Sequence, residues 1–361
     1  MGSLRDEVRL RLGVPVLRAA TLPARWYRDP DHHRTEIDAV YRHGWSCVGM
    51  ADALAKPSSF MTALVGGEIP VVVTRDAHGG LHGFLNVCRH RGSPVADGSG
   101  DARVLQCPYH AWIYQLDGRL SKARGMADVP GFDLADSGLF PVQVATWSRF
   151  VFVNPDLEAE PLDLGPLAAA IDPLGMDTME IGVSEHVVRS FNWKLLVENY
   201  SENFHTPFVH PQLEGAAWDY VIDVDGMISL ASDRMKPGWE AIASAQADEP
   251  FLSGTYFTVF PNLMVSVFPQ YFHALVVTPI DARTSRVDYH RCWAPDVGEP
   301  RRKADHEAAL AVGEQDLDIC ERVQRSYDGA LDPRGRLSPE HEKGVAHVHQ
   351  LLLRALADAA W

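Results

Sequence analysis

The chain has 361 residues, of which 46% are hydrophobic and 22% are charged, a composition typical of a globular protein large enough for two domains. Its formal net charge of -15 argues against a nucleic-acid partner, because phosphate binding needs a surplus of lysine and arginine. Five scattered cysteines are not a secreted disulfide framework, so we expect a cytoplasmic protein. We expect neither a signal peptide nor a membrane partner, because the N-terminus is charged and no apolar run is long enough to span a bilayer.

The first half of the chain indicates a helical start followed by a β-rich module. Residues 1–44 are predicted to form helix and loop, with a helical stretch at residues 34–43. From residue 45 to residue 154, short β-type runs alternate with glycine-containing turns, most clearly at residues 60–65, 69–74 and 81–87. The proline-bounded acidic stretch that follows indicates a linker.

The second half, residues 162–361, mixes helices and strands. A helix opens near Asn192, which is a good N-cap residue. Long strands are predicted at residues 255–267, 273–279 and 287–293, and helices at residues 305–327 and 339–359. The pattern predicts an α+β domain with an antiparallel sheet.

Two loops of the β module each carry one cysteine and one histidine. Cys88 and His90 form a Cys-x-His pair, and Cys107 and His110 form a Cys-x-x-His pair. A Rieske [2Fe–2S] cluster uses two cysteines on one iron and two histidines on the other. The alternative is a zinc site, but zinc modules usually space their cysteines by two to four residues, so the spacing favours the cluster.

A second group of candidate ligands follows the helix that opens near Asn192. Glu202 and His205 are three residues apart, which predicts that they share one face of that helix. Pro207 is expected to end the helix, so that His210 comes from the turn beyond it. Two histidines with open positions beside them suit non-haem Fe(II) if a carboxylate joins them.

Asp316 is the candidate carboxylate. In the long predicted helix it lies on a mostly apolar stripe with Ala309, Val312, Ile319, Cys320 and Val323. A charge that faces the core is costly, and a metal would neutralise it. Patterning alone leaves alternatives open: a salt-bridged structural Asp316, and two hydrogen-bonded core histidines at His205 and His210.

Together the two groups resemble the alpha subunits of Rieske non-haem iron oxygenases, from about Trp26 to the C-terminal helices. The resemblance implies a Rieske domain (45–154) inserted in a helix-grip catalytic domain (162–361), on which an N-terminal helical segment (1–44) packs. It implies two ligand sets: for the [2Fe–2S] cluster Cys88, His90, Cys107 and His110, and for the mononuclear Fe(II) His205, His210 and Asp316.

The resemblance also implies partners and an electron route. Family members are commonly homotrimers that receive electrons from NAD(P)H through a reductase or ferredoxin and use O2 as cosubstrate. Glu202 takes the place of the acidic residue that links a cluster histidine to an iron histidine of the neighbouring subunit. Most ring-hydroxylating members have Asp there and one more residue after the position of Asn199, so this chain is closer to the betaine, carnitine and choline monooxygenases.

The expected activity is therefore monooxygenation of a small molecule, with N-demethylation or C–N cleavage of a quaternary or tertiary amine. The alternatives are an aromatic ring-hydroxylating dioxygenase or natural-product hydroxylase and, more remotely, an electron-transfer Rieske protein. A quaternary ammonium group would bind in an aromatic cage. Seven aromatic residues are candidates, although core packing is the commoner role for most of them: Phe204, Phe208, Trp218, Tyr220, Tyr256, Phe268 and Tyr271.

Overall fold

The computed structural model describes residues 4–213, 218–235, 254–329, 332 and 334–358. The chain divides into two compact units, one of which comprises Tyr41–Leu162 and the other Met1–Val40 with Asp163–Trp361. Because the second unit is built from both sides of the first, the β module is an insertion in an α+β domain, and the predicted fold class is confirmed. Among the described helices, none has both the length and the apolar composition needed to cross a bilayer.

The inserted unit contains two antiparallel sheets. Seven strands pair in the order β1-β10-β9-β4-β3-β2-β5, and three form a small sheet β6-β7-β8. The β-type runs predicted at residues 60–65, 69–74 and 81–87 fall on β2, β3 and β4. The strands are β1 Ser46–Met50, β2 Ser59–Val65, β3 Ile69–Arg75, β4 Leu81–Leu85, β5 Ser99–Asp101, β6 Val104–Gln106, β7 Ile113–Gln115, β8 Leu120–Lys122, β9 Pro141–Trp147 and β10 Phe150–Asn154.

The second unit is built on a seven-stranded antiparallel sheet in the order β11-β17-β16-β15-β14-β13-β12. The prediction of one long strand over residues 255–267 is wrong, because the chain reverses at Phe260-Pro261-Asn262 to form the hairpin β14–β15. Proline cannot donate to a sheet ladder, which makes it a natural turn residue. The strands are β11 Glu180–Arg189, β12 Trp218–Asp225, β13 Ile228–Met235, β14 Thr255–Val259, β15 Leu263–Phe268, β16 Tyr271–Asp281 and β17 Thr284–Trp293.

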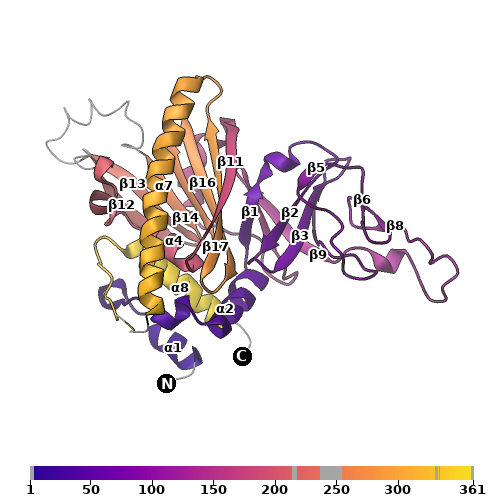
Figure 1. Cartoon of the computed structure of the whole chain (residues 1–361), viewed down its shortest axis with the longest axis horizontal. Helices are drawn as coiled ribbons and strands as arrows, with labels where there is room; N and C mark the ends of the chain where they lie inside the picture. Colours follow the sequence, from indigo (N-terminus) through magenta and orange to yellow (C-terminus); the bar gives the residue numbers. More distant parts are fainter. Residues whose placement is uncertain (1–3, 214–217, 236–253, 330–331, 333, 359–361) are drawn as a thin grey trace. The chain divides into compact units, whose positions relative to one another are not determined.

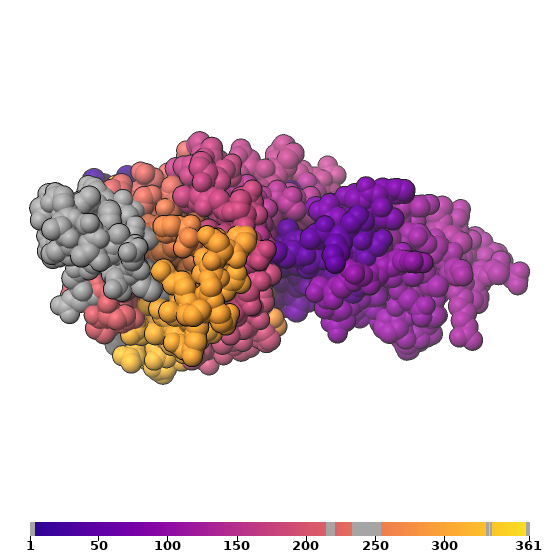
Figure 2. All heavy atoms as spheres, turned by 90° about the horizontal axis from the view of Figure 1, so that it is seen from above, coloured from indigo at the N-terminus to yellow at the C-terminus, as the bar shows by residue number. Residues whose placement is uncertain are grey.

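Helix α7 is the longest described helix and runs across this sheet (Figure 1). It begins at Glu299, earlier than predicted, because Pro300 is favourable in a first helical turn. Most of its charged residues are exposed, although Asp305 is buried, and its atoms, orange in Figure 2, reach the surface of the unit. The α-helices are α1 Leu4–Arg11, α2 Pro30–Glu36, α3 Ala168–Ile171, α4 Trp193–Tyr200, α5 Thr206–Val209, α7 Glu299–Asp328 and α8 Lys343–Asp358.

Shorter turns complete the chain. Helix α2 starts at Pro30, before the predicted residue 34, because the Asp29 side chain accepts the N–H of Asp31 and caps it. A π-type turn then continues from Ile37 to Arg42. Single 3-10 turns occur at Val16–Arg18, Ala24–Tyr27, Ala51–Leu54, Ala135–Ser137, Asp172–Leu174, Met176–Thr178 and Pro211–Leu213.

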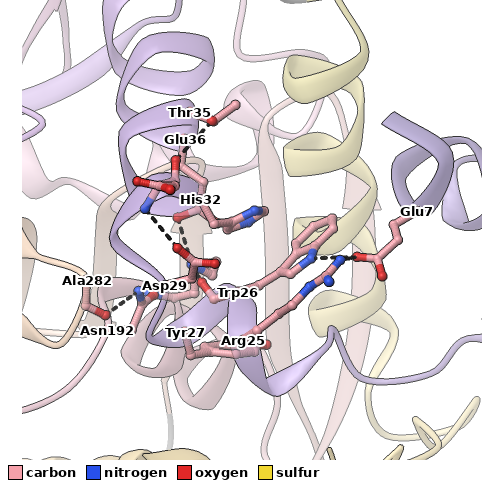
Figure 3. A network of polar contacts seen from close by, with 12 residues as sticks. Glu7, Arg25, Trp26, Tyr27, Asp29, His32, Thr35, Glu36, Asn192 and Ala282 are labelled. Carbon is pink, nitrogen blue, oxygen red and sulfur yellow. Dashed lines mark hydrogen bonds and ion pairs between the residues drawn. The ribbon is translucent and has the colours of Figure 1, made fainter. Parts of the chain in front are cut away.

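A buried ion pair fastens the N-terminal segment to α4. Lys194 Nζ lies 2.7 Å from Glu36 Oε2 and donates to the Trp26 carbonyl at 2.9 Å. Glu36 Oε1 lies 3.0 Å from His32 Nε2, and Figure 3 shows Glu36, His32 and Trp26 in one polar network. Burial raises the pKa of Glu36, but Lys194 and His32 outweigh burial and lower it to about 2. The base of α4 is thereby held against the start of the chain.

Candidate metal centres

The segment that carries the predicted iron histidines starts at a well-capped helix. Asn192 Oδ1 accepts the N–H of Lys194 at 3.1 Å, and Asn192 Nδ2 donates to the Ala282 carbonyl at 2.9 Å. Helix α4 then ends at Tyr200. The prediction that Glu202 and His205 share a face of this helix is therefore wrong, since both lie in the turn after it.

Pro207 opens a second helix instead of ending the first. It occupies the first turn of α5, where a missing N–H costs nothing. The Glu202 carboxylate accepts the backbone N–H groups of Phe204 and of His205, the latter at 3.2 Å, and so fixes the turn that precedes α5. His210 directly follows α5 and is only 2% exposed. The local sequence thus turns both histidines back toward α7.

His205, His210 and Asp316 converge. Their ligand atoms all lie within 4.8 Å of one another. Asp316 Oδ1, from α7, lies 3.3 Å from His205 Nε2 and 3.2 Å from His210 Nε2. Two imidazole nitrogens and one carboxylate oxygen form the donor set that non-haem Fe(II) takes when it keeps open positions.

An observation on Asp316 tests whether the trio suits a cation. Its Oδ1 atom is buried and has no hydrogen-bond partner among the described residues, although two histidine nitrogens lie close by. A buried carboxylate oxygen without a partner is costly, and a metal ion would satisfy it. Burial raises the pKa of Asp316, but the two histidines outweigh burial and lower it, which favours the ionised ligand. The trio therefore fits a metal.

Each histidine also has an outer partner. His205 Nδ1 lies 2.5 Å from Glu202 Oε1, and His210 Nδ1 lies 2.7 Å from Gln315 Oε1. Burial lowers the pKa of His205, but Asp316 and Glu202 outweigh burial and raise it to about 9. Gln315 was missed from the sequence because helical periodicity places it on the polar side of α7. Its position directly before Asp316, the predicted carboxylate ligand, was the only available signal.

A cavity of about 100 Å³ adjoins the trio. An engineered cavity of about 150 Å³ binds benzene, so a small molecule suits this space. Three tyrosines line it: Tyr200, Tyr256 and Tyr289.

Of the five aromatic cage candidates whose side chains the structure describes, only Tyr256 lines this cavity. Phe204 and Phe208 are 48% and 80% exposed, and Phe268 and Tyr271 are buried in a core cluster. The side chains of Trp218 and Tyr220 lie outside the described residues.

The cavity is also lined by His273 and Arg291. Burial and the neighbouring Arg291 lower the pKa of His273 to about 3. Arg291 is itself 1% exposed and pairs with Glu185. The two carboxylates that line the cavity, Asp316 and Glu202, both contact His205.

The predicted cluster ligands lie in two loops of the inserted unit. The first loop turns back on itself, since Cys88 N–H donates to Ser93 O at 2.8 Å and Gly92, with φ of 76°, donates to Cys88 O at 3.0 Å. In the second loop Cys107 N–H donates to Trp112 O at 2.9 Å.

The cysteines and the histidines of this unit differ in exposure. Cys88 and Cys107 are 3% and 2% exposed, whereas His90 is exposed and His110 half-buried, with ring centroids 4.5 Å apart. Burial raises the pKa of the Cys107 thiol, but the N–H groups of Tyr109 and His110 outweigh burial and lower it, which favours the thiolate.

The spacing of these four ligands argues against a single zinc ion. In the described part of the chain, only the His205–His210–Asp316 trio has three ligand atoms within 4.8 Å of one another. Ligands on one zinc ion lie about 2.0–2.3 Å from the metal, so any two of them are less than 4.8 Å apart. Four ligands of a single zinc ion would therefore have met the same distance limit. Two buried thiols and two outer imidazoles fit a cluster in which each pair binds its own iron.

Comparisons with protein families match both units. Residues 44–133 match the family described as "Rieske [2Fe-2S] domain", and residues 176–358 match "Ring hydroxylating alpha subunit (catalytic domain)". A [2Fe–2S] cluster in the inserted unit and a non-haem iron in the other are thereby supported.

Curated relatives are similar over nearly the whole chain. Choline monooxygenase from Arabidopsis thaliana, a chloroplastic protein, is 28% identical and covers 94% of this chain and 83% of its own. The carnitine monooxygenase oxygenase subunit of Escherichia coli is 29% identical, and the match covers 94% of this chain and 95% of that subunit. The crystal structure of the quaternary ammonium Rieske monooxygenase CntA with L-carnitine is 26% identical, with a TM-score of 0.82 over 94% of this chain and 96% of that one.

Proposed function

The chain belongs to the family of ring-hydroxylating alpha subunits, and we propose that it is the terminal oxygenase of a Rieske monooxygenase that acts on a quaternary or tertiary amine. That it is an oxygenase of the oxidoreductase class follows from its relatives. The observation that carries the proposal is the convergence of His205, His210 and Asp316 on one wall of a small cavity.

We assign the metal ligands as follows. Cys88 and Cys107 hold one iron of the cluster, His90 and His110 hold the other, and the trio in the cavity holds the mononuclear iron. The mononuclear iron, when bound, activates O2 for insertion into a C–H bond, using electrons that the cluster stores. One oxygen atom enters the substrate, and the other becomes water with two electrons and two protons. NAD(P)H supplies the electrons through a reductase.

An amine substrate is consistent with the lining of the cavity. Tyr200, Tyr256 and Tyr289 offer aromatic faces, which attract a quaternary ammonium group. The named relatives act on choline and carnitine. Hydroxylation of a carbon next to nitrogen gives a product that loses an aldehyde as the C–N bond breaks.

Glu202 is the proposed electron bridge. It already contacts His205 Nδ1. To bridge the two centres it must also contact a cluster histidine of a neighbouring subunit, which a homotrimer would supply. Glu202→Gln keeps a polar group at this position and should leave both metal centres loaded while slowing substrate-coupled turnover. Turnover unchanged from the wild type would refute the bridge.

The domain limits proposed with this function are residues 1–44 and 162–361 for the catalytic part and 45–154 for the Rieske domain. The cytoplasm is the proposed location, because the bacterial relative is a carnitine oxygenase subunit, although the plant relatives are chloroplastic.

The substrate proposal is tested by NADH consumption with a surrogate reductase and a panel of choline, glycine betaine, carnitine and tertiary amines. We expect one of them to stimulate NADH consumption and to release an aldehyde in equal amount. The second candidate function, which the family description favours, is ring hydroxylation. A cis-diol from an aromatic substrate, with no response to any amine, would replace the proposal by this alternative.

A further inference from the structure

The two iron histidines differ in the group behind them. A carboxylate oxygen of Glu202 lies 2.5 Å from His205 Nδ1, whereas a neutral amide oxygen of Gln315 lies 2.7 Å from His210 Nδ1. The His210 ring is 2% exposed, so water cannot readily replace that amide. Gln315 is thus the partner that the structure gives to the outer nitrogen of this histidine.

The amide of Gln315 is itself held in place. Gln212, from the turn after His210, donates its Nε2 to Gln315 Oε1 at 2.9 Å, and Gln315 Nε2 donates to Gln212 Oε1 at 3.2 Å. Gln315 Oε1 therefore accepts from two sides, which fills both of its lone pairs. This reciprocal amide pair joins the His210 turn to α7, which also carries Asp316.

We propose that Gln315 is a positioning residue that fixes His210 as the Nδ1–H tautomer and aims its Nε2 lone pair at the metal, while Gln212 restrains the Gln315 amide. A neutral imidazole carries its proton on one nitrogen only, and a nitrogen that carries a proton cannot ligate a metal. An acceptor behind Nδ1 places the proton there. The inference rests on the proposed function in one respect, since it takes the mononuclear metal as the occupant of the trio.

Gln315 is uncharged, whereas Glu202, the partner of the other histidine, carries a negative charge. Glu202 and Asp316 already place one carboxylate beside His205 and one beside His210. A glutamine provides the hydrogen-bond acceptor that His210 needs without adding a third carboxylate. The same geometry predicts that a glutamate at this position can replace the glutamine as acceptor, whereas an apolar side chain of similar size cannot.

The test compares four variants of the holoenzyme with the cluster intact: Gln315→Leu, Gln315→Glu, Gln212→Leu and, as a matched control, Gln270→Leu. Gln270 is exposed in the turn between β15 and β16. Anaerobic loss of mononuclear Fe(II) to excess chelator is the readout. Gln315→Leu should lose iron about 10–100-fold faster than wild type, as removal of such outer partners does. Gln315→Glu and Gln270→Leu should stay near wild type, and Gln212→Leu should fall between, about twofold to tenfold faster.

A second readout reports the proton itself. With Co(II) in the trio, the exchangeable Nδ1–H of His210 gives a paramagnetically shifted proton signal, which should broaden by exchange with water in Gln315→Leu and persist in Gln315→Glu. Wild-type iron retention and a persistent signal in Gln315→Leu would overturn the inference. Equal iron loss in the leucine and glutamate variants would also overturn it, because packing and not the acceptor would then be responsible. A wild-type chain that binds no metal at the trio would instead refute the proposed function.

Discussion

The two metal centres are built by opposite strategies. The proposed cluster ligands come from two loops of one small unit, and each loop is closed by its own backbone hydrogen bonds, such as Cys88 N–H to Ser93 O at 2.8 Å. The trio that is proposed to bind iron is assembled from distant parts of the chain, and the contact between His210 and Gln315 spans 105 residues. The first centre depends on local turns, whereas the second depends on how α7 packs against the α4–α5 turn.

This difference sets what each centre requires of the rest of the molecule. The position of the α4–α5 turn depends on the position of α4. The start of α4 is held by Asn192 and by the buried ion pair of Lys194 and Glu36. A change far from the trio in space can therefore loosen it. The cluster loops are held by neighbours inside their own unit: the Tyr114 hydroxyl lies 3.3 Å from Cys88 Sγ and accepts the Arg89 N–H at 2.9 Å. Changes within that unit are therefore the ones expected to empty the cluster site.

The largest effect is expected from Cys107→Ser. Replacing the thiolate with a hydroxyl removes a cluster ligand, so the visible absorption of the cluster and reductase-driven turnover should fall below detection, while the mononuclear iron remains. Iron analysis and absorption spectra measure both. Cys47→Ser is the matched control, because Cys47 is also buried in this unit and is not a proposed ligand. A cluster that survives in Cys107→Ser would contradict the assignment.

Asp316→Ala should have the converse effect. It removes the one carboxylate of the trio, so the mononuclear iron should be lost while the cluster spectrum is unchanged. A metal that stabilises the transition state by about 4 kcal/mol raises the turnover rate roughly a thousandfold, so we expect the turnover rate to fall by at least that factor. Asp318→Ala, an exposed aspartate on the same helix, is the control. Full iron content in Asp316→Ala would exclude the residue as a ligand.

Glu36→Gln tests whether the catalytic unit depends on its buried ion pair. The variant leaves the Lys194 ammonium buried and unpaired, so the unit should lose about 3–5 kcal/mol of unfolding free energy in urea. Replacing both partners, with Glu36→Leu and Lys194→Met together, should recover most of that loss. A single variant as stable as wild type would show that the pair does not hold α4.

The same pair sets a pH dependence. The folded-state pKa of Glu36 is about 2, below its ordinary value of 4.5, so its contribution to stability is complete above about pH 4.5 and is lost as the pH falls toward 2. Wild type and Glu36→Gln should therefore differ most near neutral pH and converge in acid. Urea unfolding at several pH values measures this.

Local sequence was sufficient for the centre that is locally built. The spacing of Cys88, His90, Cys107 and His110 predicted two loops that each carry one cysteine and one histidine, and the alternation of short strands with glycine turns predicted the sheet that carries them. The ligand roles of these four residues remain a prediction. The turn within each loop depends only on near neighbours in the chain, whereas the contact of Tyr114 with Cys88, which spans 26 residues, was not predicted.

The centre built from distant segments was harder to predict. Helical periodicity predicted that α4 would continue through Glu202, but the helix ends at Tyr200. A proline such as Pro207 can either end one helix or open the next, and the sequence alone does not distinguish the two. The turn between the helices is fixed by the Glu202 side chain, which accepts the His205 N–H. The partnerships of Gln315 with His210 and of Lys194 with Glu36 join segments far apart in the chain, and periodicity carries no information on them. The charge on an apolar stripe indicated Asp316 but left a salt-bridged structural role open, and it was the family resemblance that implied the ligand role.

The smallest expected effect concerns the cap of α4. Asn192→Ala removes the acceptor for the Lys194 N–H and the donor to the Ala282 carbonyl, so the catalytic unit should lose about 1–2 kcal/mol of unfolding free energy. Asp163→Ala removes a side-chain acceptor of a backbone N–H, that of Gly165, elsewhere in the catalytic unit and serves as the control. If the trio depends on α4, Asn192→Ala should release mononuclear iron to a chelator faster than Asp163→Ala does, with cluster content equal in both. Equal iron release from the two variants would mean that the α4–α5 turn is held by α7 alone, and the contrast between the two centres would then be smaller than the contacts suggest.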